Sequence, residues 1–483
     1  MGLTVTFKNI MEYILTTAAV TVVLAGVSQV QAQSLTDALV SAYSNNPTLL
    51  AERASLRAVD EEVPQAISNW RPTIEASGDF ARENTYNSAR SGGNTSAVRS
   101  PRGIELTVSQ PVFRGFRNRA ALNAAENAVK AARNRFLNVE QQVLLDAATA
   151  YMGVVRDQAI LELTVGNEQV LRRQLEAAED RFQVGEITRT DVSQAKARLS
   201  GATADRIQAE GSLETSRATY QKVVGAAPGK LVRPKGVAKD LPGHKVAALS
   251  LAEKAHPTVK AAMHDERAAR NNVKETEGEL LPTLSLNGTL NYNLESSSDT
   301  NEASERSIGA VLSVPLYQSG SVYSRIRQAK QTAGQQRLLI DKATRDVIEE
   351  AAQAWQALVT ARARIESFKA QVSANEIALE GVQREAAVGS RTVLDILDAE
   401  QELLDAKVNL VGAQRDETVA IFWVKATTGQ LTARQLGLDV KIYDPFKHYN
   451  ANRDKWLGSA IFGEIKGAPS SNGYDDVKKV MPK

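Results

Sequence analysis

VGEITRTDV (residues 184–192) and VGSRTVLDI (residues 388–396) are two copies of one turn, 204 residues apart in the chain. A similar segment precedes each copy: SQPVFRG (109–115) in the first half and SVPLYQSG (313–320) in the second. The same offset relates Pro111 to Pro315, Tyr151 to Trp355, Gly185 to Gly389, Asp191 to Asp395, and Gly225 to Gly429. The chain is therefore a tandem duplication, which predicts a pseudo-symmetric structure.

Two long helical hairpins are predicted around these turns. No proline occurs between Pro111 and Pro228 or between Pro315 and Pro445. As one helix, the stretch that ends at the first turn would extend roughly 105 Å at 1.5 Å per residue. The chain then reverses at the turn glycine and is expected to return as a helix of about 35 residues. A heptad spacing, which indicates coiled-coil packing, runs through Val347, Ala351, Ala354, Leu358, Ala361, Ile365, Phe368 and Val372.

A pair of strands is predicted ahead of each hairpin, because apolar and polar residues alternate there. The strands are expected at 73–80 and 104–109, with a polar loop at 84–100, and at 284–292 and 308–314, with a loop at 296–306. This pattern is typical of outer-membrane barrel strands, and an ordinary hairpin covering a soluble core fits it equally well. Four strands are too few to close a barrel, since the smallest have about eight. In a bilayer several chains would have to complete one barrel, and three copies would supply twelve strands.

The N-terminus has the pattern of a secretory signal peptide. Lys8 precedes an apolar run at 13–27, and Val30-Gln-Ala32 fits a cleavage site. A membrane anchor is the alternative, but the run is shorter than the roughly 20 residues that a spanning helix needs. The sequence has no cysteine, so disulfides and a lipid on an N-terminal cysteine are excluded.

The composition gives no indication of an enzyme or of a nucleic-acid-binding protein. Of 483 residues, 43% are hydrophobic and 24% are charged, and the net charge is +2. No basic run stands out, and no GxSxG, HExxH or CxxC motif occurs. We therefore expect no catalytic residue, no metal site and no cofactor.

The repeat sets the boundaries of the predicted segments. We expect a signal peptide at 1–32, a first repeat at 33–228, a linker at 229–245, a second repeat at 246–431 and a C-terminal extension at 432–483. Each repeat would contain a helix, a strand pair (about 72–113 and about 282–316) and a long hairpin. The first of these helices is expected at 35–67, with Pro64 kinking its end. The extension has no counterpart in the first half and is expected to be a partly disordered tail.

These features together resemble the TolC-like outer-membrane efflux protein family. The motifs that carry the resemblance are Asn46-Pro47, Arg71-Pro72, Leu281-Pro282, Gln110–Gly115 and the two turns. The resemblance implies a mainly α fold with membrane β structure. Three chains would form a 12-stranded β-barrel, continuous with a periplasmic α-helical coiled-coil tunnel. The protein would lie in the outer membrane of a Gram-negative bacterium, in contact with outer-membrane lipid, and extend far into the periplasm.

The same resemblance implies partners and a task. The trimer would be an exit duct for drugs, other toxic compounds and proteins, in multidrug resistance or type I secretion. It would work with a periplasmic adaptor protein and with an inner-membrane efflux pump or ABC-type secretion transporter. The family closes its tunnel where the helical turns converge, by means of charged pairs. Here the matching residues are Asp191 and Arg391, and Arg189 is a candidate to replace a latch tyrosine that this chain lacks at Ala386.

Two further carboxylates match the constriction of the family. Asp395 and Asp398 are three residues apart and share one helix face, so three chains would place six carboxylates around the pore. The turns themselves are the expected docking surface for the adaptor, at Gly185, Thr188, Gly389 and Thr392. Without the resemblance, the preferred interpretation of Asp191 is an N-terminal helix cap, and that of Asp395 and Asp398 is ordinary solvated surface charges.

A soluble periplasmic coiled-coil adaptor or scaffold is the alternative function. Adaptors also carry long helical hairpins, but they lack this duplication and have no need of strands with a barrel pattern. The two functions differ in their location, since an adaptor would leave the outer-membrane fraction in mild detergent.

Overall fold

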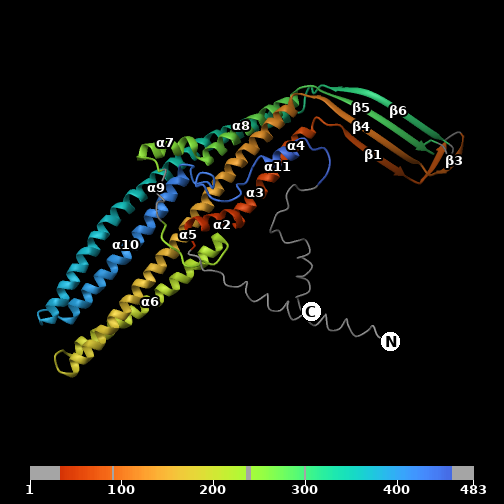
Figure 1. Ribbon diagram of the computed structural model, residues 1–483. Helices are drawn as coiled ribbons and strands as arrows, with labels where there is room; N and C mark the ends of the chain where they lie inside the picture. The colour runs from red at the N-terminus through yellow and green to blue at the C-terminus, as the bar shows by residue number, and fades with distance from the viewer. Residues whose placement is uncertain (1–32, 90–91, 235–240, 298–300, 460–483) are drawn as a thin grey trace, which may run out of the picture. The chain divides into compact units, whose positions relative to one another are not determined.

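The computed structural model describes residues 33–89, 92–234, 241–297 and 301–459 (Figure 1). The predicted signal peptide at 1–32 lies outside the described residues. The chain divides into two compact units: unit 1 comprises Met1–Asn46, Glu140–Ala248 and Ala352–Val440, and unit 2 comprises Pro47–Val139, Leu249–Ala351 and Lys441–Lys483. Each unit draws on both halves of the sequence, so neither copy of the repeat is a compact unit by itself.

Two long helical hairpins are present, as the proline-free stretches predict (Figure 1). α5 (Arg117–Gln183) and α9 (Ser321–Ala387) have 67 residues each and contribute to both units. The return helices are α6 (Arg189–Val224, 36 residues) and α10 (Val393–Thr427, 35 residues). No helix in the described part of the chain is both long enough and apolar enough to cross a bilayer.

The predicted heptad seam of α9 is buried along most of its length. Val347, Ala351, Ala354, Leu358, Ala361 and Ile365 are each less than 9% exposed, and Phe368 and Val372 are half-buried. In unit 1 the small seam residue Ala354 and its neighbour Leu358 pack against Ile421 and Val424 of α10. Alanine in the seam lets the two helices of the hairpin approach closely, so the pairing depends on shape rather than on bulky side chains.

The helix expected at 35–67 is instead three helices: α2 (Leu35–Asn45), α3 (Pro47–Asp60) and α4 (Glu62–Ser68). The first break follows from Pro47, since the residue before a proline is disfavoured in helical conformation. The second break is at Glu61 rather than beyond Pro64. A helical Pro64 has no N–H for the carbonyl of Asp60 and its ring would clash with it, so the interruption falls one turn earlier than predicted.

The four predicted strands form one antiparallel sheet in unit 2. Its order is β1 (Thr73–Phe80), β4 (Arg102–Arg114), β5 (Thr283–Leu294) and β6 (Glu302–Ser313), so the strand pairs of the two repeats lie next to each other. β1 and β6 are the open edges of this sheet. Unit 2 also contains α8 (Pro257–Glu277) and the short helix η1 (Gly278–Leu280), and α7 (Lys245–Ala255) spans the boundary between the units.

Both predicted loops are shorter than expected. Most of the first is a second hairpin, in which β2 (Glu83–Ala89) pairs with β3 (Gly92–Arg99). The second loop ends at Asn301, because β6 begins at Glu302. Backbone hydrogen bonds hold these strands together, and they do not require the apolar alternation on which the prediction relied.

The described part of the C-terminal extension, residues 432–459, contacts both units of the chain. Within unit 1, the backbone N–H of Ala433 donates to the buried carboxylate of Glu140 (2.7 Å). Within unit 2, residues 441–459 include α11 (Lys447–Asn452), and Tyr449 packs against the apolar cluster around Val63 and Val129. The part of the extension at 460–483 lies outside the described residues.

Candidate functional site

The two turns have the same backbone geometry, which places the candidate gate residues in equivalent positions. Gly185 and Gly389 have φ values of +81° and +80°, a left-handed conformation that glycine adopts without a steric cost. α6 and α10 then begin with Thr188 and Thr392 as N-caps. Gly185 and Thr188, and likewise Gly389 and Thr392, therefore occupy equivalent positions in two turns of the same shape. These four residues are the predicted docking surface.

Asp191 closes a capping box at the start of α6, which is the structural role considered for it from the sequence. Its Oδ2 accepts hydrogen bonds from the backbone N–H and the hydroxyl of Thr188, both at 2.8 Å. In return, the backbone N–H of Asp191 donates to Thr188 Oγ1 (3.3 Å). These bonds favour the ionised carboxylate and hold the pKa of Asp191 below its usual value. The capping box uses only Oδ2 of the Asp191 carboxylate, so Oδ1 takes no part in it.

Asp395 closes the equivalent box at the start of α10. Its Oδ2 accepts from the backbone N–H and the hydroxyl of Thr392, again at 2.8 Å. The pKa of Asp395 is lowered for the same reason, with a smaller contribution from Arg391. Asp191 and Asp395 therefore both remain charged at neutral pH, and the duplication has preserved the bonding pattern as well as the residues.

Arg391 is held by its own hairpin. Its Nε donates to Glu385 Oε2 (2.9 Å), and Nη1 lies 3.8 Å from Oδ1 of Asp395. Both carboxylates raise the pKa of Arg391, Glu385 the more strongly. Within the described part of a single chain, Arg391 makes no ion pair with Asp191, and Arg189 makes none with any residue. One chain therefore brings together Arg391 and Asp395, but not the two proposed partners of the latch.

Asp398 forms an ion pair with a residue that the sequence analysis did not identify as functional. Its Oδ1 forms an ion pair with Nη2 of Arg198, which lies on α6 of the first hairpin. Both side chains are partly exposed, 41% for Arg198 and 52% for Asp398. No sequence signal marks Arg198, because the contact joins residues 200 positions apart.

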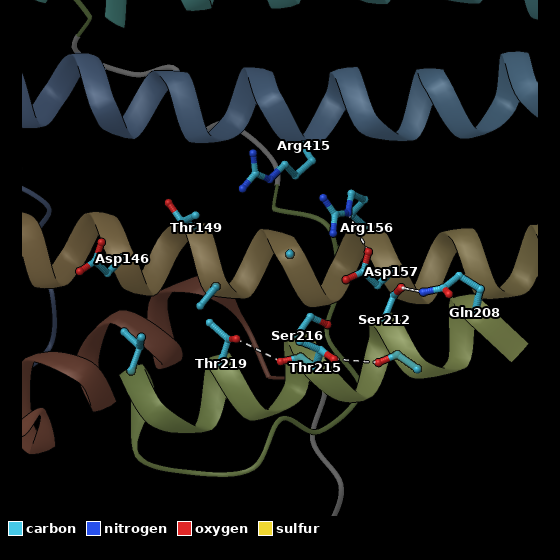
Figure 2. A pocket seen from close by; sticks show the side chains of 14 residues that line it. Asp146, Thr149, Arg156, Asp157, Gln208, Ser212, Thr215, Ser216, Thr219 and Arg415 are labelled. Atoms are coloured by element: carbon cyan, nitrogen blue, oxygen red, sulfur yellow. Dashed lines mark hydrogen bonds and ion pairs between the residues drawn. The ribbon is translucent and has the colours of Figure 1, made fainter. Parts of the chain in front are cut away.

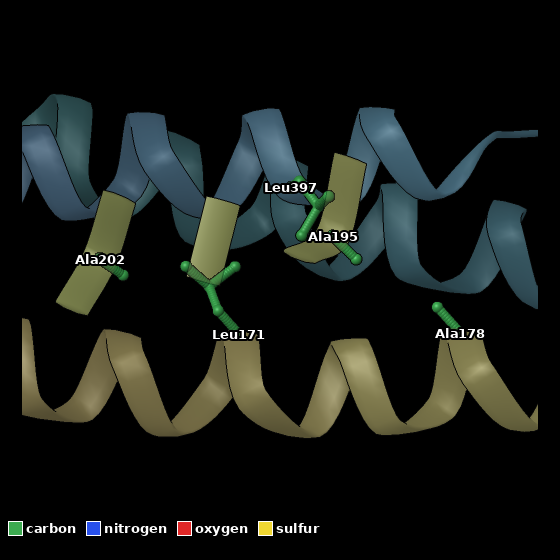
Figure 3. Packing of buried hydrophobic residues seen from close by; sticks show 5 residues of the cluster. All are labelled: Leu171, Ala178, Ala195, Ala202 and Leu397. Atoms are coloured by element: carbon green, nitrogen blue, oxygen red, sulfur yellow. The ribbon is translucent and has the colours of Figure 1, made fainter. Parts of the chain in front are cut away.

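An apolar contact beside this ion pair joins the two hairpins within unit 1 (Figure 3). Leu397 is 1% exposed and belongs to one buried cluster with Leu171, Ala178, Ala195 and Ala202 of the first hairpin. One turn further along α10, the buried Glu400 accepts a long hydrogen bond from Gln174 of α5 (3.4 Å). Burial raises the pKa of Glu400. The hairpins are therefore joined by packing close to their turns, and not only by charges.

A cavity of about 540 Å³ lies along α5 and α6 in unit 1 (Figure 2). Its charged lining includes Arg156, Asp157 and Arg415, and Arg156 Nε donates to Asp157 Oδ1 (2.7 Å). Small residues such as Gly153 and Ser212 make up much of the remaining wall. No group of three or more His, Cys, Asp or Glu side chains within reach of one metal ion occurs among the described residues. The cavity therefore offers a charge pair and small side chains.

The sheet of unit 2 has one apolar face and one polar face, as the alternation predicts. Its register aligns Ile74, Val108, Gly288 and Ile308 in one row, and Glu75, Thr107, Thr289 and Ser307 in the next row on the opposite face. The apolar side chains are exposed in the single chain: 69% for Ile74 and 94% for Ile308, at the two edge strands. An apolar surface of this extent on an open sheet requires an apolar environment or a protein partner.

Comparison with known proteins assigns both repeats to one family model. The model described as "Outer membrane efflux protein" matches residues 38–226 and 248–429. The outer membrane efflux protein BepC of Brucella suis biovar 1 is 38% identical over 427 residues, which cover 88% of this chain and 92% of BepC. The outer membrane protein TolC of Escherichia coli is 26% identical over 420 residues, covering 84% of each chain.

A solved structure has the same fold. The CmeC outer membrane channel of Campylobacter jejuni superposes with a TM-score of 0.74 at 17% sequence identity, covering 87% of this chain and 89% of CmeC. At this low sequence identity the similarity shows a shared fold over most of both chains.

Proposed function

The chain belongs to the outer membrane efflux protein family, and on this premise we propose that three copies form the exit duct of an export machine with three components. The protein is an outer-membrane efflux channel of a Gram-negative bacterium, with a helical tunnel and a β domain. The match of one family model to both repeats carries this conclusion. It does not support the adaptor or scaffold function, which the sequence alone had left open.

The open sheet supports assembly into a trimer. β1 and β6 present unpaired edges, and bilayer lipid offers no hydrogen bonds to such edges. Pairing β6 of one chain with β1 of the next would close a ring, and three chains would contribute twelve strands. The exposed apolar face would then contact outer-membrane lipid, and the polar face would line the channel.

We place the periplasmic gate at the turns. Asp191 keeps Oδ1 outside its capping box, so it can accept a bond from Arg391 or Arg189 of a neighbouring chain without losing the cap. Each such pair is weak in water, but a ring repeats it three times and a docking protein can break it. Asp395 and Asp398 would form the constriction and favour cations. Gly185, Thr188, Gly389 and Thr392 would shape the surface on which the adaptor docks.

The energy for transport would come from the partners. A periplasmic adaptor would connect this duct to an inner-membrane efflux pump or to an ABC-type secretion transporter, and that partner would choose the cargo among drugs, toxic compounds and proteins. The channel itself would carry out no reaction and hold no cofactor. Its contribution is a polar path with a gate that the adaptor opens.

Single-channel recording of the purified protein in a planar bilayer tests the duct. We expect small, cation-selective current steps, because a closed gate leaves a narrow path lined by carboxylates. Insertion is checked separately by recovering the protein from the bilayer or from matched vesicles. An absence of current with the protein confirmed in the bilayer would refute the proposal and favour a scaffold.

A further inference from the structure

Two carboxylates of the proposed constriction have different electrostatic partners. Asp395 is bound to its own turn, where Oδ2 caps α10 and Oδ1 lies 3.8 Å from Arg391. Asp398, one turn further along α10, pairs instead with Arg198 of the first hairpin. Nε of Arg391 also donates to Oε2 of Glu385 (2.9 Å), so the charge of Arg391 is shared between Glu385 and Asp395. Arg198 makes no other ion pair among the described residues, so its charge offsets Asp398 alone.

The backbone position of Arg198 is set by packing of its helix and does not depend on the strength of the ion pair. An exposed ion pair alone contributes little, typically 0–1 kcal/mol, and would not hold two helices together. Here Leu397, the neighbour of Asp398, is buried against Ala195, which precedes Arg198 by three residues and therefore shares its helix face. The apolar contact between Leu397 and Ala195 (Figure 3) thus holds the backbone of α6 next to that of α10, within reach of the ion pair between Arg198 and Asp398.

We propose that Arg198 determines the ion selectivity of the constriction by neutralising Asp398. The net negative charge of the ring is then carried mainly by the three Asp395 carboxylates, and cation preference is weaker than six carboxylates would give. This inference rests on the proposed function, since it requires Asp395 and Asp398 to face a pore. It makes Arg198 a specificity-determining residue on a helix that itself supplies no constriction carboxylate.

The test compares purified trimers in planar bilayers under a salt gradient, from which the ratio of cation to anion permeability is obtained. Arg198→Gln should raise this ratio about sevenfold for each unmasked carboxylate, because a unit charge roughly 7 Å from the path in water favours a cation and disfavours an anion by a factor of about 2.7 each. Arg198→Lys retains the charge and should leave the ratio close to that of the wild type. Asp398→Asn should lower the ratio, because it leaves Arg198 without its partner. The double variant, Arg198→Gln with Asp398→Asn, should return the ratio towards the wild-type value.

Arg217→Gln is the matched control. Arg217 lies on the same helix, is also 41% exposed and pairs with Glu214, but it is 19 residues away from Arg198. This separation is about 28 Å along a helix, well beyond the screening length of about 10 Å at 0.1 M salt. The ratio of cation to anion permeability of Arg217→Gln should therefore stay at the wild-type value. Equal shifts for Arg198→Gln and Arg217→Gln would overturn the proposal, because a general loss of charge would then explain both.

The outcomes separate this inference from the duct itself. If neither the wild type nor any variant conducts, the proposed function fails. If the wild type conducts and Asp398→Asn lowers the ratio while Arg198→Gln leaves it unchanged, the duct stands and the role of Arg198 is refuted. Trimer assembly is measured by light scattering before each recording. Should Arg198→Gln not assemble, the double variant is compared with Asp398→Asn instead. A higher ratio in the double variant supports the proposal, because the two proteins differ only in the charge of residue 198, and equal ratios overturn it.

Discussion

Asp191 and Asp395 occupy equivalent positions in the two repeats, and each makes the same bonds to the threonine three residues before it. These caps constrain how the gate can work, since a carboxylate already bound to a helix N-terminus has one oxygen left for a neighbour. The two roles considered for Asp191, cap and latch, are therefore compatible. Arg391, in contrast, must be shared between Glu385 and any partner in the next chain.

Arg391→Glu should open the proposed gate. The variant replaces a cation between Glu385 and Asp395 by a third carboxylate, so repulsion replaces attraction within the turn and towards Asp191 of the next chain. We expect the single-channel conductance to rise severalfold. Arg384→Glu is the control, since Arg384 lies on α9 shortly before the turn and pairs with Glu380. An unchanged conductance for Arg391→Glu in a correctly assembled trimer would exclude Arg391 from the latch.

At the scale of elements, the sequence predicted most accurately what depends on local pattern. The long helices follow from proline-free runs with a heptad seam, and the turns follow from Gly185 and Gly389 with their capping threonines. β2 and β3 were missed because their sequences are mostly polar and lack a regular apolar alternation, so only backbone pairing reveals them. The contact between Arg198 and Asp398 could not be predicted, because it depends on how two hairpins pack.

The packing of the C-terminal segment, residues 441–459, likewise could not be predicted from local sequence pattern. Tyr443, Phe446 and Tyr449 belong to no repeat and gave no periodic signal, yet all three contact unit 2. Arg133 stacks on the ring of Phe446 at 4.1 Å, and the buried His448 lies 3.3 Å from Asp60. Burial raises the pKa of Asp60, and the nearby cation of Arg133 opposes this rise. The segment is therefore part of the folded unit.

Tyr449→Ala should loosen this segment. The substitution removes a partly buried ring from the cluster of Val63, Ala66 and Val129, which we expect to cost about 1–3 kcal/mol locally. Limited proteolysis should then cleave residues 441–459 faster than in the wild type. Lys447→Ala, at the exposed first position of α11, provides the control and should be cleaved at the wild-type rate. Equal protection of all three proteins would show that the ring contact does not hold the segment.

At the scale of the whole molecule, a single chain is incomplete. The sheet of unit 2 has two open edges and an exposed apolar face. In unit 1, the two helical hairpins of the chain are joined near their turns by packing around Leu397. The proposed trimer would supply what the single chain lacks, since neighbouring chains would pair with the open edges and lipid would cover the apolar face. The strand alternation predicted the two faces, but only the register between β1, β4, β5 and β6 shows that they are continuous.

Ile308→Lys and Ser307→Lys test this assembly, because the two residues are adjacent on β6 and point to opposite faces. A lysine on the lipid face costs about 2–4 kcal/mol per chain at the bilayer centre, and each trimer would carry three of them. We therefore expect Ile308→Lys to reduce the amount of trimer recovered from the outer-membrane fraction. Ser307→Lys adds the same charge to the polar face, where water can solvate it, and should still assemble. If both variants assembled equally well, or if only Ser307→Lys were lost, the apolar face would not be the lipid-facing surface and the proposed closure of the sheet would be wrong.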